Sequence, residues 1–175
     1  MKRHALIIEE YACWGCRACE VACKQEHHQP DGINYIYVNE MGPKSINGKL
    51  DFMYRINVCK HCDSPPCAKA CPEQAIFKRQ DGIVAIDYES CTGCRACIDE
   101  CPYDAITFDR AGGIARKCDL CSNRVDQGLY PACADNICLG HCIYFGDPVE
   151  IKKKILEKRE IRGGWGEIIP KVLAT

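Results

Sequence analysis

Apolar positions occur along this chain in short runs bounded by glycine, proline and polar residues. Alternating or β-branched residues at 35–38, 52–58 and 83–86 predict β-strands. A Gln-Asp-Gly turn at 80–82 precedes the third run, and a Gly-, Pro- and Asn-rich stretch at 42–48 separates the first two. Because such residues form the turns that join antiparallel strands, the pattern predicts β-hairpins.

Predicted helices are short, with one exception. The stretch from Arg95 to Glu100 contains no helix breaker and predicts a short helix. Residues 151–161 (IKKKILEKREI) form a basic, amphipathic pattern, which is usually a solvated helix face. The following tail carries Trp165 and an apolar end that a small core does not bury, so 151–175 are predicted to dock on a partner. The short helices and hairpins together predict an α+β fold.

Composition favours a modest apolar core. Hydrophobic residues make up 47% of the 175 residues, but this share includes 17 cysteines, and there are only 4 Phe and 2 Trp. The formal net charge of −1 gives no support to nucleic-acid binding, which needs a basic stripe. We therefore expect a fold that is crosslinked by bound metal and forms poorly without it.

Sixteen of the 17 cysteines fall into four groups, and three groups have nearly the spacing C-x2-C-x2-C-x3-C. This is the spacing by which bacterial ferredoxins hold 4Fe–4S clusters. Zinc, which binds paired C-x2-C knuckles, is the alternative, but it does not explain three tight quartets. The three regular groups are Cys13, Cys16, Cys19 and Cys23; Cys59, Cys62, Cys67 and Cys71; and Cys91, Cys94, Cys97 and Cys101.

The fourth group is irregular. Aligning the residues after Cys138 with those after Cys101 places Cys142 on Ala105, so Cys142 is interpreted as spare. Four residues rather than three separate Cys133 from Cys138. Two alternatives therefore stay open: Cys142 replaces one of these neighbours, or the chain holds three clusters instead of four. The predicted ligands of this group are Cys118, Cys121, Cys133 and Cys138.

Each cluster is predicted to take ligands from two groups. In two-cluster ferredoxins the fourth cysteine of one run binds the other cluster. The same rule, applied here as a nested pairing, predicts four 4Fe–4S clusters in a row with the outer pair beside the inner pair. The inner sets are Cys59, Cys62, Cys67 with Cys101, and Cys91, Cys94, Cys97 with Cys71; the outer sets are Cys13, Cys16, Cys19 with Cys138, and Cys118, Cys121, Cys133 with Cys23.

Several residues beside the ligands are candidates for tuning cluster potentials. His61 and His141 are interpreted equally as hydrogen-bond donors to sulfur or as plain loop residues, and His27 and His28 as surface or interface residues. No serine–histidine–acid or paired-carboxylate arrangement is found, so no catalytic residue is predicted. Cations next to ligands would favour a reduced cluster, although many would merely be solvated: Arg17, Lys60, Arg95, Arg116 and Lys117.

Three phrases of the sequence resemble one known family. They are CRACEVACKQE (16–26), CKHCDSPPCAKACP (59–72) and RKCDLCSNRVDQG…PAC (116–133). The family comprises the four-cluster ferredoxin-like electron-transfer subunits of molybdenum and tungsten oxidoreductases, including those of dimethyl sulfoxide reductase and formate dehydrogenase types. The resemblance implies two fused bacterial-ferredoxin-like modules and a row of clusters that ends near a pterin cofactor on a large catalytic partner.

The residues at 71–77 (CPEQAIF) resemble those at 101–108 (CPYDAITF), and a glycine-containing turn follows each, at 80–82 and 111–113, so each copy predicts a hairpin. The predicted domain boundaries follow this repeat. An inner module at about 50–115 is nested within an outer module formed by 1–30 and 116–150, with a hairpin insert at 31–58. The four-cluster domain thus covers 1–150, followed by the docking tail.

Location and partner are expectations of the same kind. The apolar run from Ala5 to Ile8 ends at Glu9 and is too short for a secretion signal, and no stretch is long enough to span a membrane, so reduced cysteines in an anaerobic cytoplasm are expected. These features look more like the small subunits of tungsten enzymes of the aldehyde:ferredoxin oxidoreductase type. The dearomatising class II benzoyl-CoA reductase is the preferred complex, with further electron-donor subunits or a ferredoxin as partners. The alternatives are a free-standing polyferredoxin, a formate dehydrogenase or dimethyl sulfoxide reductase-type subunit, and a redox sensor that uses Cys142.

Overall fold

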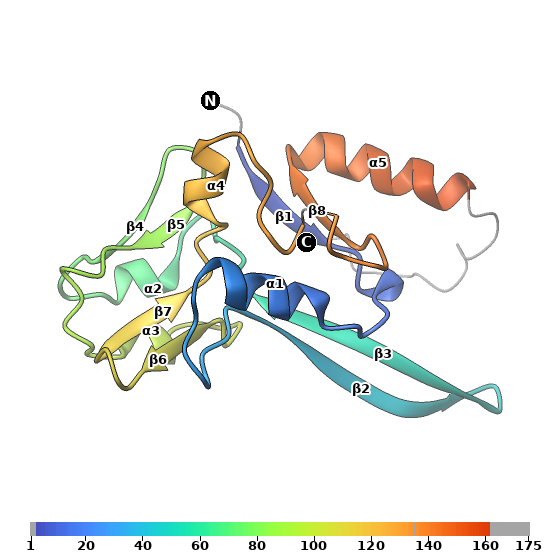
Figure 1. Cartoon of the computed structure of the whole chain (residues 1–175), viewed down its shortest axis with the longest axis horizontal. Coiled ribbons are helices and arrows are strands. Elements are labelled where there is room, and N and C mark those ends of the chain that lie inside the picture. The colour runs from blue at the N-terminus through green and yellow to red at the C-terminus, as the bar shows by residue number, and fades with distance from the viewer. Residues whose placement is uncertain (1–2, 135, 162–175) are drawn as a thin grey trace.

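The structure is a computed structural model in which residues 3–134 and 136–161 are described. Short helices and antiparallel hairpins give the α+β arrangement that the sequence predicts (Figure 1). The predicted docking tail at 162–175 lies outside the described residues. In chain order the elements are β1 (Ala5–Ile8), η1 (Glu10–Ala12), α1 (Ala18–Glu26), β2 (Ile36–Ile46), β3 (Lys49–Val58), α2 (Pro66–Lys69), β4 (Ile76–Lys78), β5 (Val84–Ile86), α3 (Ala96–Asp99), β6 (Ile106–Asp109), β7 (Ile114–Lys117), α4 (Ser122–Asp126), β8 (Ile143–Gly146) and α5 (Pro148–Ile161).

The described strands pair only in twos. β4 pairs with β5 and β6 with β7, and each of these hairpins follows the last cysteine of a group, as the repeat predicts. β1 instead pairs with β8, so that Ala5 lies opposite Gly146. This pairing brings the segment before the first cysteine group against the segment after the fourth, and the two inner hairpins lie in the chain between them.

The long hairpin of β2 and β3 projects from the rest of the molecule (Figure 1). The sequence predicted a loop over 42–48, but the strands continue to Ile46 and resume at Lys49. The Gly-Pro pair is accommodated by a register shift between Met41 and Lys44, and the turn falls on two residues with positive φ, Asn47 and Gly48. Turn residues here mark a bulge inside a strand as well as its end.

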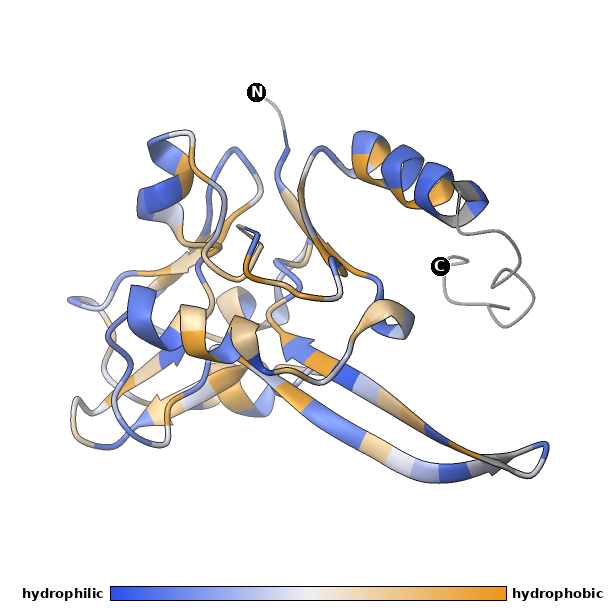
Figure 2. Ribbon diagram, turned by 45° about the vertical axis from the view of Figure 1, so that its right-hand side comes forward, coloured by the Kyte–Doolittle hydropathy of each residue, from blue (hydrophilic) through white to orange (hydrophobic). Residues whose placement is uncertain are grey.

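α5 is the predicted basic helix, and it packs against β1 and β8. Ile151 and Ile155 lie one turn apart and are buried, while Lys153 and Lys154 are exposed. Figure 2 shows the resulting alternation of hydrophobic and hydrophilic residues along the helix. None of the helices within 3–134 and 136–161 has the length and apolarity that crossing a lipid bilayer requires.

Cysteine sulfur fills the middle of the molecule together with aliphatic side chains. One buried cluster joins the base of the β2–β3 hairpin to Cys19, Cys23 and Cys118. A second joins Ile76, Val84 and Ile106 of the inner hairpins to Cys67 and Cys97. Among the described residues these two buried clusters hold one aromatic side chain, Tyr35, so their cohesion is expected to depend on what the cysteines bind.

Two glycines permit close approach around the cysteine loops. Gly93 has a φ of +71°, and a Cβ there would lie 2.0 Å from the carbonyl oxygen of Gly113. Gly15 has a φ of +67°, and its Cβ would lie 2.3 Å from the Tyr54 ring. Side chains rarely adopt this backbone region, so conformation favours glycine at both positions, and the close neighbours leave no space for a Cβ.

Gly93→Ala is expected to destabilise the protein more than Gly113→Ala. Both residues have similar φ, +71° and +67°, but nothing lies within 4 Å of a Cβ at Gly113. The backbone strain of roughly 1 kcal/mol is therefore shared, and only Gly93→Ala adds the overlap, at roughly 1–3 kcal/mol. Anaerobic thermal unfolding of the two variants measures the difference. Equal losses of stability would contradict the close packing of this loop.

Candidate metal centres in four cysteine groups

Cys59, Cys62, Cys67 and Cys101, here called the Cys59 set, line one cavity. Burial, with repulsion from Cys59 and Cys101 contributing, raises the pKa of the Cys62 thiol. Three cysteines of one group therefore face the last cysteine of the next. The residues around this cavity include Cys59, Cys62, Cys67, Cys101, Val84 and Ile106.

Cys71, Cys91, Cys94 and Cys97, here called the Cys71 set, line a second cavity. Burial and then repulsion from Cys67 and Cys71 raise the pKa of Cys97 to about 11. Cys97 is thus close to a cysteine of each cavity, and α2 contacts α3 between them. The residues around this cavity include Cys71, Cys91, Cys94, Cys97, Ile76 and Ala115.

The Cys13 set comprises Cys13, Cys16, Cys19 and Cys138. Burial raises the pKa of Cys19 to about 12, with smaller contributions from Glu20 and then from Cys13 and Cys138. Burial likewise raises the pKa of Cys13, and repulsion from Cys138 and Cys16 adds to this. The start of the chain and the segment near β8 therefore contribute to one group of thiols.

The Cys23 set comprises Cys23, Cys118, Cys121 and Cys133. Burial raises the pKa of Cys23 to about 12, opposed by a hydrogen bond from Gln29 and increased by repulsion from Cys121. Burial also raises the pKa of Cys133, to which Cys121 and then Cys23 contribute. Cys118 has Cys133 and Cys23 among its cysteine neighbours. The cysteines of each predicted mixed set thus lie near one another, and their assignment as cluster ligands stays a prediction.

The four sets follow one another in space. Cys133 of the Cys23 set is close to Cys19 of the Cys13 set. Burial and then repulsion from Cys59 raise the pKa of Cys118, which joins the Cys23 set to the Cys59 set. Cys97 joins the Cys59 and Cys71 sets, so the order is Cys13, Cys23, Cys59 and Cys71 sets.

Only two of the 17 cysteines are exposed, and they lie at the ends of this row. Cys16 belongs to the Cys13 set and Cys94 to the Cys71 set, while all the other cysteines are buried or half-buried. The row therefore has a solvent-facing sulfur at each end and covered thiols between them.

A backbone turn recurs at the start of every group. The residue two places after the first cysteine has a left-handed φ at Gly15, His61, Gly93 and Leu120. The backbone N–H of Gly15, His61 and Leu120 donates to the sulfur of that first cysteine at 3.4–3.5 Å. The sequence revealed this turn only where glycine occupies it; a histidine and a leucine adopt it in the other two groups.

The irregular fourth group repeats the geometry of Cys101. The backbone N–H of Ala105 donates to the Cys101 sulfur at 3.5 Å, and that of Cys142 donates to the Cys138 sulfur at 3.4 Å. The preceding residues, Asp104 and His141, share left-handed φ values of 49° and 46°. Cys138 thus has the local structure of a terminal cysteine, and Cys142 occupies the position of Ala105.

Cys142 lies beside the Cys13 set. Its sulfur is 3.4 Å from that of Cys138, and it is only 1% exposed. Burial, followed by the contacts with Cys138 and Cys13, raises the pKa of the Cys142 thiol. These contacts make Cys142 a neighbour of Cys138, whereas Cys133 has Cys121, Cys23 and Cys19 as its cysteine neighbours.

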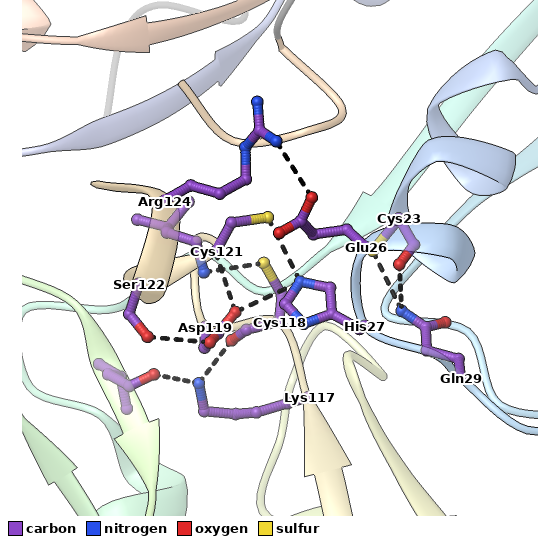
Figure 3. Close-up of polar contacts among 12 residues, drawn as sticks. Cys23, Glu26, His27, Gln29, Lys117, Cys118, Asp119, Cys121, Ser122 and Arg124 are labelled. Atoms are coloured by element: carbon purple, nitrogen blue, oxygen red, sulfur yellow. Dashed lines mark hydrogen bonds and ion pairs between the residues drawn. The ribbon is translucent and has the colours of Figure 1, made fainter. Parts of the chain in front are cut away.

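Two polar side chains that the sequence did not single out as sulfur contacts reach the Cys23 set (Figure 3). The Nε2 atom of His27 lies 3.3 Å from the Cys121 sulfur and 3.5 Å from Oδ1 of Asp119, and Gln29 donates to the Cys23 sulfur at 3.2 Å. His27, predicted as a surface or interface residue, has a side chain only 16% exposed. Its position four residues after Cys23, at the end of α1, was the available signal.

The trio of His27, Asp119 and Cys121 has ligand atoms close enough to hold a metal ion. A histidine N–H that donates to a cluster-binding sulfur gives the same geometry. The wider donor set decides between them, because each of the four sets supplies four cysteine sulfurs, the ligands of a 4Fe–4S cluster. Buried thiolates need a compensating cation, which bound iron supplies. The residues present therefore fit four such clusters.

Comparison with known proteins gives the same answer. A family model described as a 4Fe-4S dicluster domain matches residues 50–148, and a second with the same description matches 12–76. The protein belongs to the 4Fe–4S dicluster family. Two dicluster domains correspond to four 4Fe–4S clusters, for which the 17 cysteines suffice.

Curated relatives extend the similarity. A putative dimethyl sulfoxide reductase iron-sulfur subunit of Halobacterium salinarum is 36% identical over 84% of this chain and 67% of its own. A tetrathionate reductase subunit of Salmonella typhimurium is 38% identical over 83% of this chain and 58% of its own length. A polysulfide reductase chain of Wolinella succinogenes is 36% identical over 88% of this chain and 81% of its own length. The present sequence thus spans between 58% and 81% of the length of these relatives.

Cys142→Ala is expected to retain all four clusters, because the neighbouring Cys138 has the terminal-cysteine geometry. The double variant Cys138→Ala/Cys142→Ala removes both sulfurs and is expected to lose the cluster of the Cys13 set. Iron analysis should give about 16 atoms per chain for the first and about 12 for the second. Loss of iron from Cys142→Ala alone would show that Cys142 is the ligand.

Proposed function

We propose that this chain is the iron–sulfur electron-transfer subunit of a reductase complex and is not catalytic by itself. The observation that carries the proposal is the continuous row of four cysteine sets, with an exposed sulfur at each end. One-electron transfer is the chemistry that bound 4Fe–4S clusters supply. A row that reaches the surface at two points suits passage of electrons between a donor and a separate catalytic chain.

The proposed ligands are the four mixed sets. The chain's own residues hold the sulfurs, cover the two middle sets and direct backbone N–H groups at sulfur. Such hydrogen bonds and burial set the potentials of bound clusters. In this proposal electrons enter or leave near Cys16 and Cys94.

The proposed partner is a large catalytic subunit that carries a molybdenum or tungsten pterin. The relatives are named as subunits or chains of dimethyl sulfoxide, tetrathionate and polysulfide reductases. These names support a dimethyl sulfoxide reductase-type complex better than the benzoyl-CoA reductase preferred from the sequence, for which tungsten was expected. A formate dehydrogenase-type complex stays an alternative, and the cytoplasmic location stays a prediction.

A free-standing polyferredoxin is the second candidate function. The exposed cysteines at both ends of the row favour it, because a diffusing carrier needs an accessible cluster. The projecting β2–β3 hairpin favours the subunit instead, because its outer half leaves Met41, Leu50 and Phe52 exposed. An apolar arm of this kind is expected at an interface.

Anaerobic native purification of the complex tests the proposal. A large partner carrying molybdenum or tungsten is expected to copurify, with about 16 irons on this chain. A fully loaded chain that purifies alone and reduces several acceptors would replace the subunit with the carrier. A complex whose large subunit lacks both metals would contradict the proposed partner.

Two matched variants test the proposed ligand sets. Cys97→Ser is expected to damage the inner pair, which is formed by the clusters of the Cys59 and Cys71 sets. Cys16→Ser is expected to damage only the cluster of the Cys13 set, at one end of the row. The losses are measured as iron per chain and as signals in electron paramagnetic resonance of the reduced protein. Iron loss with an unchanged rate of electron transfer in either variant would refute the proposed row.

A further inference from the structure

Lys117 is a fully buried cation at the centre of the molecule. It ends β7, where Ala115 and Lys117 face inward while Ile114 and Arg116 are only half-buried. Lys117 is 1% exposed, and its Nζ atom donates to the carbonyl oxygen of Cys118 at 2.7 Å (Figure 3). It also donates to the carbonyl oxygen of Val84. A lysine normally extends its ammonium group to water, so this burial requires a reason.

No carboxylate compensates this charge among the residues that the structure describes. Lys117 takes part in none of the ion pairs found there. The nearest acid in sequence, Asp119, accepts hydrogen bonds from the backbone of Cys121 and the hydroxyl of Ser122. A buried ammonium that contacts two neutral carbonyl groups is strongly unfavourable unless a negative charge lies nearby.

The ammonium group lies between two cysteine sets. Its acceptor Cys118 belongs to the Cys23 set, and its acceptor Val84 lines the cavity of the Cys59 set. Burial raises the pKa of Cys67, and the Lys117 ammonium is the largest influence opposing that rise. Cys118 and Cys59 are themselves neighbours across this junction. The missing negative charge therefore has an obvious source in the two middle groups of thiolates.

We propose that Lys117 is the shared counter-charge of the Cys59 and Cys23 sets and favours the reduced state of the clusters they hold. The inference rests on the proposed ligand sets. Reduction by one electron from a neighbouring cluster makes a set one unit more negative, with no bond formed or broken. A fixed positive charge stabilises that added electron, and low polarity around it strengthens the effect.

The placement makes this effect local. Lys117 touches the middle of the row, whereas Cys16 and Cys94 lie at its solvent-exposed ends, where water screens charge. The two middle clusters should therefore gain more from Lys117 than the two end clusters. This pattern keeps the covered centre of the row reducible, although burial alone would disfavour an added negative charge there.

Arg116 provides a matched control. It precedes Lys117 on the same strand, but its side chain is 27% exposed and its Nε atom is 2.7 Å from a carboxylate oxygen of Asp109. It therefore already has its own counter-ion. Arg116→Gln removes a positive charge one residue away without removing the buried one.

Redox titration of the purified complex, monitored by electron paramagnetic resonance, tests the inference after iron analysis. In Lys117→Met the reduced-to-oxidised ratio of the two middle clusters at fixed potential should fall about tenfold, which is 59 mV for one electron. The end clusters should change much less, Arg116→Gln should resemble the original protein, and Lys117→Arg should restore most of the ratio.

The outcomes distinguish the role of Lys117 from the correctness of the proposed ligand sets. Unchanged ratios in Lys117→Met at about 16 irons per chain would overturn the role of Lys117 while leaving the electron-transfer proposal intact. If Lys117→Met loses iron, the iron content of Lys117→Arg is decisive. Retention of all clusters in Lys117→Arg supports the counter-charge, and a loss equal to that of Lys117→Met shows that Lys117 has a packing role only. Fewer than about 16 irons in the unaltered chain would instead count against the proposed ligand sets.

Discussion

The rest of the structure depends on one constraint, the need to compensate buried cysteine thiolates with bound iron. Most of the cysteines are buried or half-buried, and burial raises the pKa of many of them, for example Cys19 to about 12 and Cys97 to about 11. A thiolate in such a place is unfavourable unless a cation offsets its charge. Cluster binding and folding are therefore expected to be coupled, in keeping with the sparse apolar core.

Local backbone geometry serves the same constraint. The left-handed turn after the first cysteine recurs in every group, and in three of them it directs the amide of Gly15, His61 or Leu120 toward sulfur. Polar side chains add to this at the Cys23 set, where Gln29 and His27 contact sulfur. The protein thus places hydrogen-bond donors beside several of its sulfurs, where they stabilise negative charge.

Spacing predicted the sets of cysteines that the structure brings together, because cysteines three residues apart can wrap one loop around a cluster. It also predicted the inner hairpins and α5. The sequence pattern placed the loop between β2 and β3 too early, because the Gly42-Pro43 pair lies at a bulge within the paired strands. The sequence pattern could not predict the burial of His27 and of Lys117, because both depend on segments far away in the chain.

The pairing of β1 with β8 has a consequence for biosynthesis. The Cys59 and Cys71 sets are complete once residue 101 has left the ribosome, whereas the two outer sets wait for Cys133 and Cys138. Cys13, Cys16, Cys19 and Cys23 are made first yet find their partners last. Nascent chains therefore expose thiols from the first group for most of translation, and the half of the row formed by the Cys59 and Cys71 sets is complete before the half formed by the Cys13 and Cys23 sets.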